Sequence, residues 1–395
     1  MQQISRRKVL FGLGAVPLAL AGCGGGGGGS AAPAGTAFAA KPVVDNLADG
    51  IITQTYRNLN SAATALVAAV QALVSAPTEA AMDAAQSAWK AARVPWESSE
   101  GFLFGPVDAL GIDPSIDSWP LNTPDLLAFL TANPDATQAD VENASDDLRG
   151  FHAMEYLLFG DGVGDNDKLV GELTAAEANY LVALAQAFQA RTQTLETSWT
   201  TSYNGGAPYA TTLKSPGSGS AYAGYGAVIE ELINGIAGIA DEIGNAKIAE
   251  PLGTSLATAD TSKVESQYSW NSLTDFHNNM QSVLNIYTGK LGFNWSTDTV
   301  SVSLNGLYAF VAYHDTTLAT RVLSEIIAAQ QKIALIKGDG IDTTTAITGA
   351  AKPFRTQILD ANGRLLASEA IAACNTLRAT LTDDVLPLLG DTAFA

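Results

Sequence analysis

Long stretches of helix-forming residues, with apolar side chains every three or four positions, constrain the fold of this chain more than any other feature. From Val43 to Ser75, Leu, Ile and Val side chains recur at the spacing of one helix face. The chain is rich in Ala and has few runs of β-branched residues, which favours helices over strands. About eight long helices with short connections predict an all-α protein built from helical bundles.

The connections between the predicted helices are rich in Gly, Pro, Ser or Asp. The segment from Gly111 to Asn122 is expected to be a loop over the surface. Asp161 to Asp167 is expected to be a solvated turn, because it lacks the spaced ligands and terminal Glu of a calcium-binding loop. The predicted helices are 43–75, 78–105 with Thr78 as N-cap, 123–131, 137–142, 145–160, 174–202, 222–249, 272–289, 304–336 and 344–389.

Two helical-bundle domains are expected, at 42–165 and 170–390, with residues 265–290 packing against the first. A short internal match points to a duplication. Leu148–Glu155 aligns without gaps with Leu304–Val311, with Leu, Gly and Ala identical. So short a match can arise by chance, and it is weak evidence. If the duplication is real, only the first copy keeps a His/Glu pair, because the second has Tyr and Val there.

The N-terminus has the features of an export signal. Residues 1–22 combine Arg6 and Arg7 with an apolar stretch too short to span a bilayer. The small residues before Cys23 resemble the lipobox of bacterial lipoproteins, in which the Cys thiol receives the lipid. Residues 23–41, which begin with a run of glycines, are expected to be a flexible tether. The twin-arginine and the general export routes both remain open.

The formal net charge of −19 argues against a nucleic-acid partner, because an acidic surface repels phosphates.

The signal-like N-terminus predicts that the protein is exported and lipid-anchored at Cys23. Gly24, where an inner-membrane retention signal would have Asp, favours the periplasmic face of the outer membrane over the outer face of the cytoplasmic membrane. Acylation of Cys23 leaves Cys374 without a disulfide partner, and its apolar surroundings predict a buried, inert thiol.

His152 and Glu155 are the first candidates for chemistry. Three residues apart on a predicted helix, they project from one face, where an imidazole and a carboxylate can share a metal ion or transfer a proton. The alternative is a solvated surface pair with no function. Gly150, two residues before His152, weakens the helix and suggests a close approach of another group.

Three blocks of the sequence resemble the imelysin family. Gly150-Phe151-His152-Ala153-Met154-Glu155 is similar to its Gly-x-His-x-x-Glu motif. Ala88–Pro106 resembles its Trp/Arg/Trp/Glu/Phe-Gly-Pro block, and Ser269–Asn279, leading to Tyr287–Gly289, resembles a second polar block. The resemblance spans roughly Pro42 to Leu389. It implies two helical bundles with the motif near their interface, and a link to iron acquisition.

The resemblance gives weight to further candidates in the other two blocks. Glu97 and Glu100 could add the oxygen ligands that ferric iron prefers, with Arg93 holding one carboxylate in place. Asp275 and Asn278 share a helix face and could reach the same site. His277 is expected to point elsewhere, and His314 is a weak candidate in the second repeat.

The resulting hypothesis is a lipoprotein that binds iron, or a small iron-bearing ligand, during uptake, with an iron-transport protein as partner. His152 and Glu155 are its central expected ligands, and zinc or another divalent metal is the alternative to iron. A metal-dependent peptidase is a second reading. It is weakened by the lack of a third clear ligand, since the chain has three His and no His-Glu-x-x-His motif. A structural or adaptor lipoprotein is the third.

Overall fold

The computed structural model describes residues 37–336 and 353–395. Over these ranges the chain forms helices joined by turns and short loops, without a β-strand, so the predicted all-α class is confirmed. The predicted signal peptide, Cys23 and residues 23–36 of the predicted tether lie outside the described residues, as does the start of the helix predicted at 344–389.

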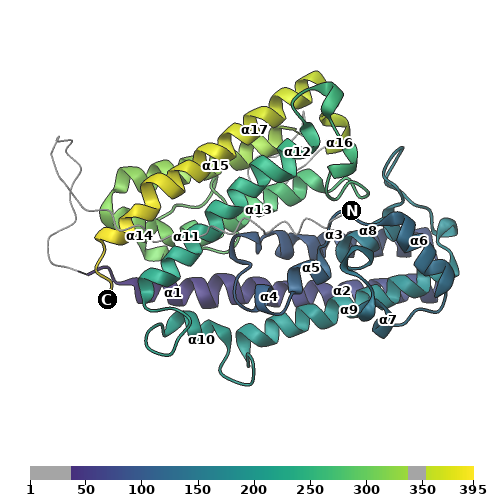
Figure 1. Cartoon of the computed structure of the whole chain (residues 1–395), viewed down its shortest axis with the longest axis horizontal. Coiled ribbons are helices and arrows are strands. Elements are labelled where there is room, and N and C mark those ends of the chain that lie inside the picture. Colours follow the sequence, from purple (N-terminus) through teal and green to yellow (C-terminus); the bar gives the residue numbers. More distant parts are fainter. Residues whose placement is uncertain (1–36, 337–352) are drawn as a thin grey trace.

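One layer of the molecule is a bundle around the N-terminal helix (Figure 1). Ala40–Ser75 is continuous over 36 residues, long and apolar enough to cross a membrane by length and composition alone. Its apolar face packs instead against two long helices of this layer, so it is a core helix of the bundle. The elements are α1 (Ala40–Asn46), the π-helical η1 (Leu47–Thr53), α2 (Gln54–Ser75), α3 (Glu79–Glu97), α8 (Gly150–Phe159) and α9 (Ala175–Thr200).

The second layer lies above the first in Figure 1 and holds the C-terminal helices. Its central helix, α13, packs on α15 and also contacts α3 of the first layer. The main elements of this layer are α11 (Tyr225–Glu242), the π-helical η5 (Ile243–Ile248), α12 (Ala249–Leu252), α13 (Ser272–Thr288), α14 (Leu307–His314), α15 (Thr316–Ile336) and α17 (Ala361–Ala379).

Short elements fill the connections. Those between α3 and α9 are η2 (Glu100–Phe102), α4 (Pro106–Ala109), α5 (Ile112–Ile116), α6 (Thr123–Ala132), α7 (Gln138–Asn143), η3 (Asp146–Leu148) and η4 (Val170–Glu172). The later ones are α10 (Tyr209–Lys214), η6 (Leu256–Thr258), η7 (Thr261–Lys263), η8 (Val302–Leu304), α16 (Phe354–Gln357), η9 (Thr380–Val385) and η10 (Leu386–Asp391).

Several predicted boundaries are confirmed and others are wrong. Thr78 caps α3 by accepting a hydrogen bond from the Ala81 amide, as predicted. The helix predicted to run to residue 105 ends at Glu97, where Ser98 and Ser99 turn the chain into a 3-10 turn. The helix predicted at 145–160 is broken at Arg149, whose backbone is extended.

Two further differences concern larger segments. The predicted surface loop at 111–122 contains the short helix α5. The residue that follows α5, Asp117, has a buried side chain. The predicted boundary near residue 165 assigns α9 to the second region, whereas α9 packs against α2 and α8 of the first bundle. Helix α9 therefore belongs with the first bundle by its packing. The loop at 161–167 separates α8 from α9 in the sequence, but it does not mark a boundary between the two bundles.

The order of elements is compatible with the predicted duplication. In each half a 3-10 turn ending in Leu precedes a short helix that begins at or just after Gly, and a long helix comes later; in the first half further short elements lie between α3 and η3, and η4 lies between α8 and α9. The first series is α3, η3, α8 and α9, and the second is α13, η8, α14 and α15. Gly150 and Gly306 hold matching places at the start of the short helices.

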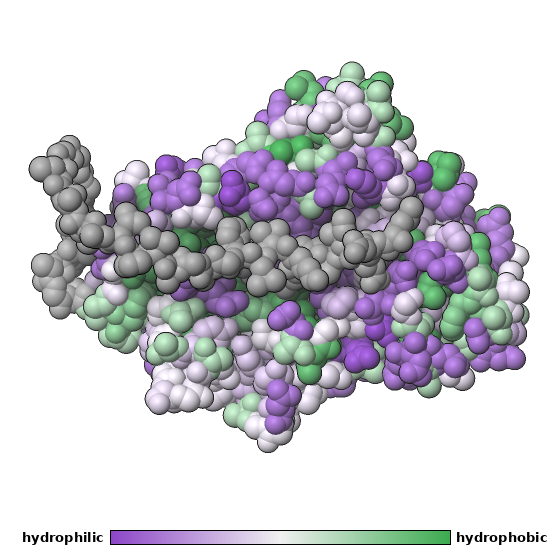
Figure 2. Space-filling view, viewed as in Figure 1, coloured by the Kyte–Doolittle hydropathy of each residue, from purple (hydrophilic) through white to green (hydrophobic). Residues whose placement is uncertain are grey.

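The ends of the described chain meet beside α1 and α14. Phe38 forms a parallel bridge with Phe394, and the Phe38 amide donates to Ala393 O at 2.7 Å. The Phe38 ring lies edge-on to Phe310. The first described residues therefore lie next to the last residues of the sequence. Figure 2 shows hydrophilic residues over much of one face, with hydrophobic ones in small groups between them.

Candidate metal site

A cluster of nine charged or titratable side chains lies buried between the two layers, and we call it the polar cluster. Helices from both layers and the loops between them contribute to it. The side chain of Asp117 is 4% exposed and the remaining residues are 8% exposed or less. Its members are the acids Glu97, Glu100, Asp117, Glu155, Glu265 and Asp275 and the bases Arg93, His152 and Lys247.

The side chains of His152 and Glu155 on α8 are in contact, as predicted, but only His152 also faces the other acids of the cluster. His152 Nδ1 lies 2.8 Å from Glu155 Oε2. The other oxygen of Glu155 accepts hydrogen bonds from the backbone amide and the hydroxyl of Ser269, at 2.8 and 2.7 Å. Glu155 thus fixes the ring of His152 from behind, in the arrangement by which carboxylates orient metal-binding imidazoles.

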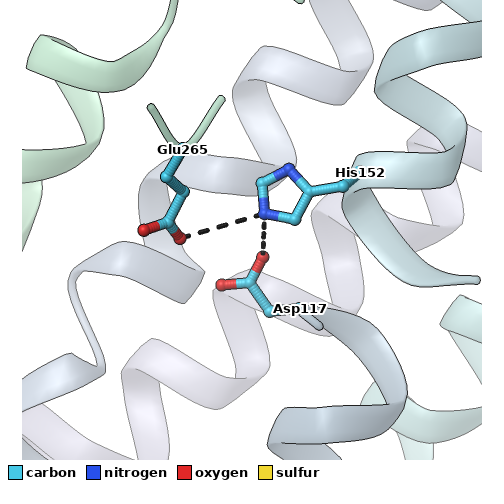
Figure 3. Close-up of side chains that lie close together, drawn as sticks. All are labelled: Asp117, His152 and Glu265. Carbon is cyan, nitrogen blue, oxygen red and sulfur yellow. Dashed lines mark ion pairs between the residues drawn. The ribbon is translucent and has the colours of Figure 1, made fainter. Parts of the chain in front are cut away.

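The free side of the imidazole points at two carboxylates from other elements (Figure 3). His152 Nε2 lies 3.2 Å from Asp117 Oδ1 and 3.8 Å from Glu265 Oε1. One ligand atom from each of the three residues lies within 4.8 Å of the others, which is close enough to share one ion. The ring of Trp119 packs edge-on against that of His152, with centroids 4.7 Å apart.

Gly150 explains how Asp117 comes to lie beside His152. Its φ is +76°, in the region that favours glycine. A Cβ at this position would lie 2.3 Å from Ile116 O, the residue just before Asp117. The close approach suggested by the sequence is therefore that of the α5 segment, and it brings Asp117 to the first turn of α8.

Arg93 is the central base of the cluster. Its Nε and Nη2 donate to Asp275 Oδ2 at 3.2 and 3.0 Å, and its Nη1 and Nη2 also pair with Asp117 and Glu97. Because α3 supplies Arg93 and α13 supplies Asp275, this contact joins the two layers. Hydrogen bonds from Ser266 and Asn271 complete the surroundings of the Asp275 carboxylate.

Glu97 and Glu100 extend the cluster on the other side of Asp117. One ligand atom of each lies within 4.8 Å of the others in a second group of acids with Asp117. Glu97 Oε2 accepts a hydrogen bond from Asn279 Nδ2 at 2.5 Å. Lys247 Nζ lies 3.7 Å from the same oxygen of Glu97 and 3.5 Å from Glu265 Oε2.

Burial and charge shift the pKa values of the cluster in opposite directions. Burial raises the pKa of Glu97 to about 8, although Arg93 and Lys247 act against it, and burial also raises the pKa of Glu100 and of Asp275. Burial would raise the pKa of Asp117, but Arg93 and His152 outweigh it and lower that pKa.

The bases shift the other way from what burial alone would produce. Burial would lower the pKa of His152, but contacts with Asp117, Glu155 and Glu265 raise it well above its usual value. The surrounding carboxylates likewise raise the pKa of Lys247 against the effect of burial. At neutral pH these shifts favour the protonated forms of His152 and Glu97.

The donor set of the cluster fits a metal ion. Six acids against three bases leave a surplus of negative charge in a buried place, which a cation or bound protons must balance. His152 Nε2 is buried and forms no well-oriented hydrogen bond within the described chain. One imidazole nitrogen with several carboxylate oxygens suits iron, zinc or manganese, and the oxygen-rich side favours hard ions.

The structure brings together most of the residues singled out in the sequence. Asn278 is the exception, since Asn279, one position on, makes the contact with Glu97. The ring of His314 bonds Thr392 near the C-terminus, away from the cluster, and His277 is buried on α13, where its carbonyl lies near Gln330.

Three members of the cluster were not predicted: Asp117, Glu265 and Lys247. Lys247 had no clear signal, because Asp241, Glu242 and Glu250 lie near it in sequence, as on an ordinary solvated helix. Glu265 lies just before the second polar block. Asp117 had none, as Asp is common in Pro- and Gly-rich loops.

Comparisons with known proteins agree with this fold. The imelysin family profile matches residues 52–381. Iron-regulated protein A of Synechococcus elongatus is 27% identical over 346 residues, covering 88% of this chain and 86% of that protein. A crystal structure of an iron-regulated protein A precursor from Parabacteroides distasonis has a TM-score of 0.72 at 29% identity, covering 89% of this chain and 96% of that one.

An imelysin-like protein from Psychrobacter arcticum shares the fold at lower identity. Its TM-score is 0.65 at 16% identity, and the match covers 89% of this chain and 95% of that one. The match to the family profile extends over most of the chain and includes the three blocks that resemble imelysins. This chain belongs to the imelysin family.

Proposed function

We propose that this protein binds iron, or a small iron-bearing ligand, during iron uptake, with His152, Asp117 and Glu265 as the central ligands. The observation that carries the proposal is the convergence of these three side chains in a buried cluster with surplus negative charge. The similarity to proteins named for their regulation by iron favours iron over zinc.

The residues divide into ligands and supports. His152 would bind through Nε2, because Nδ1 is engaged by Glu155. Glu97 and Glu100 are close enough to Asp117 to complete an oxygen-rich shell. Glu155 would then act as a positioning residue. Binding requires His152 to lose its Nε2 proton, so the affinity is expected to rise with pH.

The peptidase alternative receives less support from this geometry. A metallopeptidase needs an open coordination position for water and room for a peptide beside the metal. The cluster is instead enclosed, with Trp119 against His152. An enclosed site suits an ion or a very small ligand. An adaptor function would leave the surplus carboxylates without a role beyond packing.

Metal binding by the purified, metal-stripped full chain tests the proposal. Calorimetry and thermal unfolding with ferrous, ferric and zinc ions should give one ion per chain and a stabilised fold, since a ligand at 100 times its Kd adds about 2.7 kcal/mol. His152→Ala, Asp117→Asn and Glu265→Gln should each weaken binding at least tenfold.

Two substitutions outside the cluster serve as controls. His314→Ala removes a histidine near the C-terminus, and Glu369→Gln removes an exposed carboxylate paired with Lys332. Both should bind metal like the parent chain. Binding that survives all three cluster substitutions would contradict the assigned site. Chelator-sensitive cleavage of peptides, lost on His152→Ala, would favour the peptidase instead.

We also propose that the chain is exported and acylated at Cys23, with an iron-transport protein as its partner. The proposal rests on the sequence before residue 24 and on the glycine run after it. Cys23→Ser should move the protein from the membrane fraction to the soluble fraction. Retention of that variant in the membrane would contradict acylation as the anchor.

A further inference from the structure

Lys247 is a buried cation that neither the family motif nor the proposed ligand set includes. It lies on the π-helical segment η5, and its side chain is 2% exposed. Nζ lies 3.5 Å from Glu265 Oε2 and 3.7 Å from Glu97 Oε2, so it touches two residues of the proposed metal site. π-helical turns within α-helices are frequent at functional sites.

Arg93 and Lys247 are the two bases of the cluster with a permanent charge, and their contacts differ. Arg93 donates to Asp275 at 3.0 and 3.2 Å and pairs with two more carboxylates. Lys247 has no ion pair shorter than 3.5 Å among the described residues, longer than the roughly 2.7–2.9 Å of a close charge-assisted hydrogen bond. A lysine side chain is also a flexible four-carbon stem, whereas a guanidinium is a rigid fork.

Glu242 offers Lys247 a second partner nearer the surface. Glu242 Oε1 lies 4.0 Å from Nζ, and its side chain is 24% exposed, against 2% or less for Glu97 and Glu265. Residues 242 and 247 are five apart, the spacing that a π-helical turn brings together. A rotation of the Lys247 side chain alone can therefore carry its charge from the buried acids towards Glu242.

We propose that Lys247 is the displaceable counter-ion of the metal site. Without metal, its ammonium balances the charge of Glu265 and lies beside Glu97, and it holds these two side chains near each other. When a metal ion enters, the two cations repel each other and Lys247 turns towards Glu242. The residue thus lowers the affinity of the site and keeps binding reversible, as a protein that hands on its metal requires. This role rests on the function proposed above.

Titration calorimetry with ferrous iron and zinc tests the role on the metal-stripped full chain. Lys247→Met should bind metal at least tenfold more tightly than the parent chain. The same variant should unfold at a lower temperature than the parent when metal is absent, because the acids lose their counter-ion. Lys332→Met, which removes an exposed lysine paired with Glu369, should change neither quantity.

Glu242→Gln tests where the ammonium goes. It should weaken metal binding severalfold in the parent chain, because Lys247 loses its second partner. Combined with Lys247→Met, it should have no further effect, since no ammonium remains to move. Additive effects would contradict the movement to Glu242.

The outcomes separate this role from the proposed function. If the parent chain binds no metal, the function is wrong and this role with it. If the parent binds metal and Lys247→Met binds equally or less tightly, Lys247 is a fixed ion pair and only this role is overturned. Lys247→Gln repeats the comparison if Lys247→Met does not fold.

Discussion

Single residues of the polar cluster are held away from their usual protonation states. The unfolded chain would ionise Glu97 above its ordinary pKa of 4.5, whereas the folded, metal-free protein keeps the proton up to about pH 8. Folding therefore binds a proton within this window. His152, whose folded pKa is raised, acts in the same direction above 6.5, its ordinary value. The pKa of Asp117 is lowered, so this carboxyl stays ionised throughout the window and adds no pH dependence there.

The metal-free protein should thus lose stability as pH rises from 5.5 to 8, which is the sign expected when the folded state binds the extra proton. The free energy of unfolding should fall by up to about 1.4 kcal/mol per pH unit for each such group. Urea unfolding in a chelator, at several pH values, measures the slope. Glu97→Gln should flatten it, whereas exposed Glu369→Gln should not. An unchanged slope in Glu97→Gln would show that this carboxyl is ionised in the folded state.

At the scale of elements, helix α11 shows why two similar glycines differ. Gly235 faces η2, and a Cβ there would lie 2.1 Å from Gly101 O. Gly238, one turn later, has no neighbouring atom within 4 Å of an added Cβ. Of these two glycines, only Gly235 is therefore required for close packing. It lets η2, which carries Glu100, approach the second layer.

Gly235→Ala should lower the free energy of unfolding by more than about 2 kcal/mol, because backbone must move away from the new methyl group. Gly238→Ala is the matched control in the same helix, and it should stabilise the protein by up to about 1 kcal/mol through helix propensity. Chemical unfolding of both variants compares the two. Equal effects would mean that η2 does not rest on Gly235.

At the scale of the whole molecule, the polar cluster is the joint between two bundles. Arg93 from the first layer bonds Asp275 from the second, and Asn279 of α13 bonds Glu97 of α3. A buried ion pair adds little stability over a well-packed apolar pair, but removing one partner is costly, since it leaves charges without compensation. The stability of the contact between the two layers should therefore depend on Arg93.

Arg93→Met should lower the free energy of unfolding by about 3–5 kcal/mol, because it leaves buried carboxylates facing one another. Lys332→Met, at an exposed ion pair, should cost no more than about 1 kcal/mol. Calorimetric scans of the two variants give both values. A loss for Arg93→Met as small as that of the control would mean that the cluster does not hold the layers together.

The sequence predicted contacts that depend only on helix geometry. His152 with Glu155, and Arg93 with Glu97, are one turn apart, and a helix fixes such neighbours whatever surrounds it. Its failures came at helix ends and in loops. The break at Arg149 is one example, because it lies where Gly150 meets the backbone of Ile116 from another segment.

By itself, the sequence determined the all-helical class, the family and the polar residues on α3, α8 and α13. Only the tertiary structure decided that Asp117, Glu265 and Lys247 meet them, and that Glu155 lies behind His152. The physical reason is distance along the chain. Periodicity fixes the direction of side chains within one helix, whereas contacts between helices depend on packing, which positions such as Gly150 and Gly235 control through backbone approach.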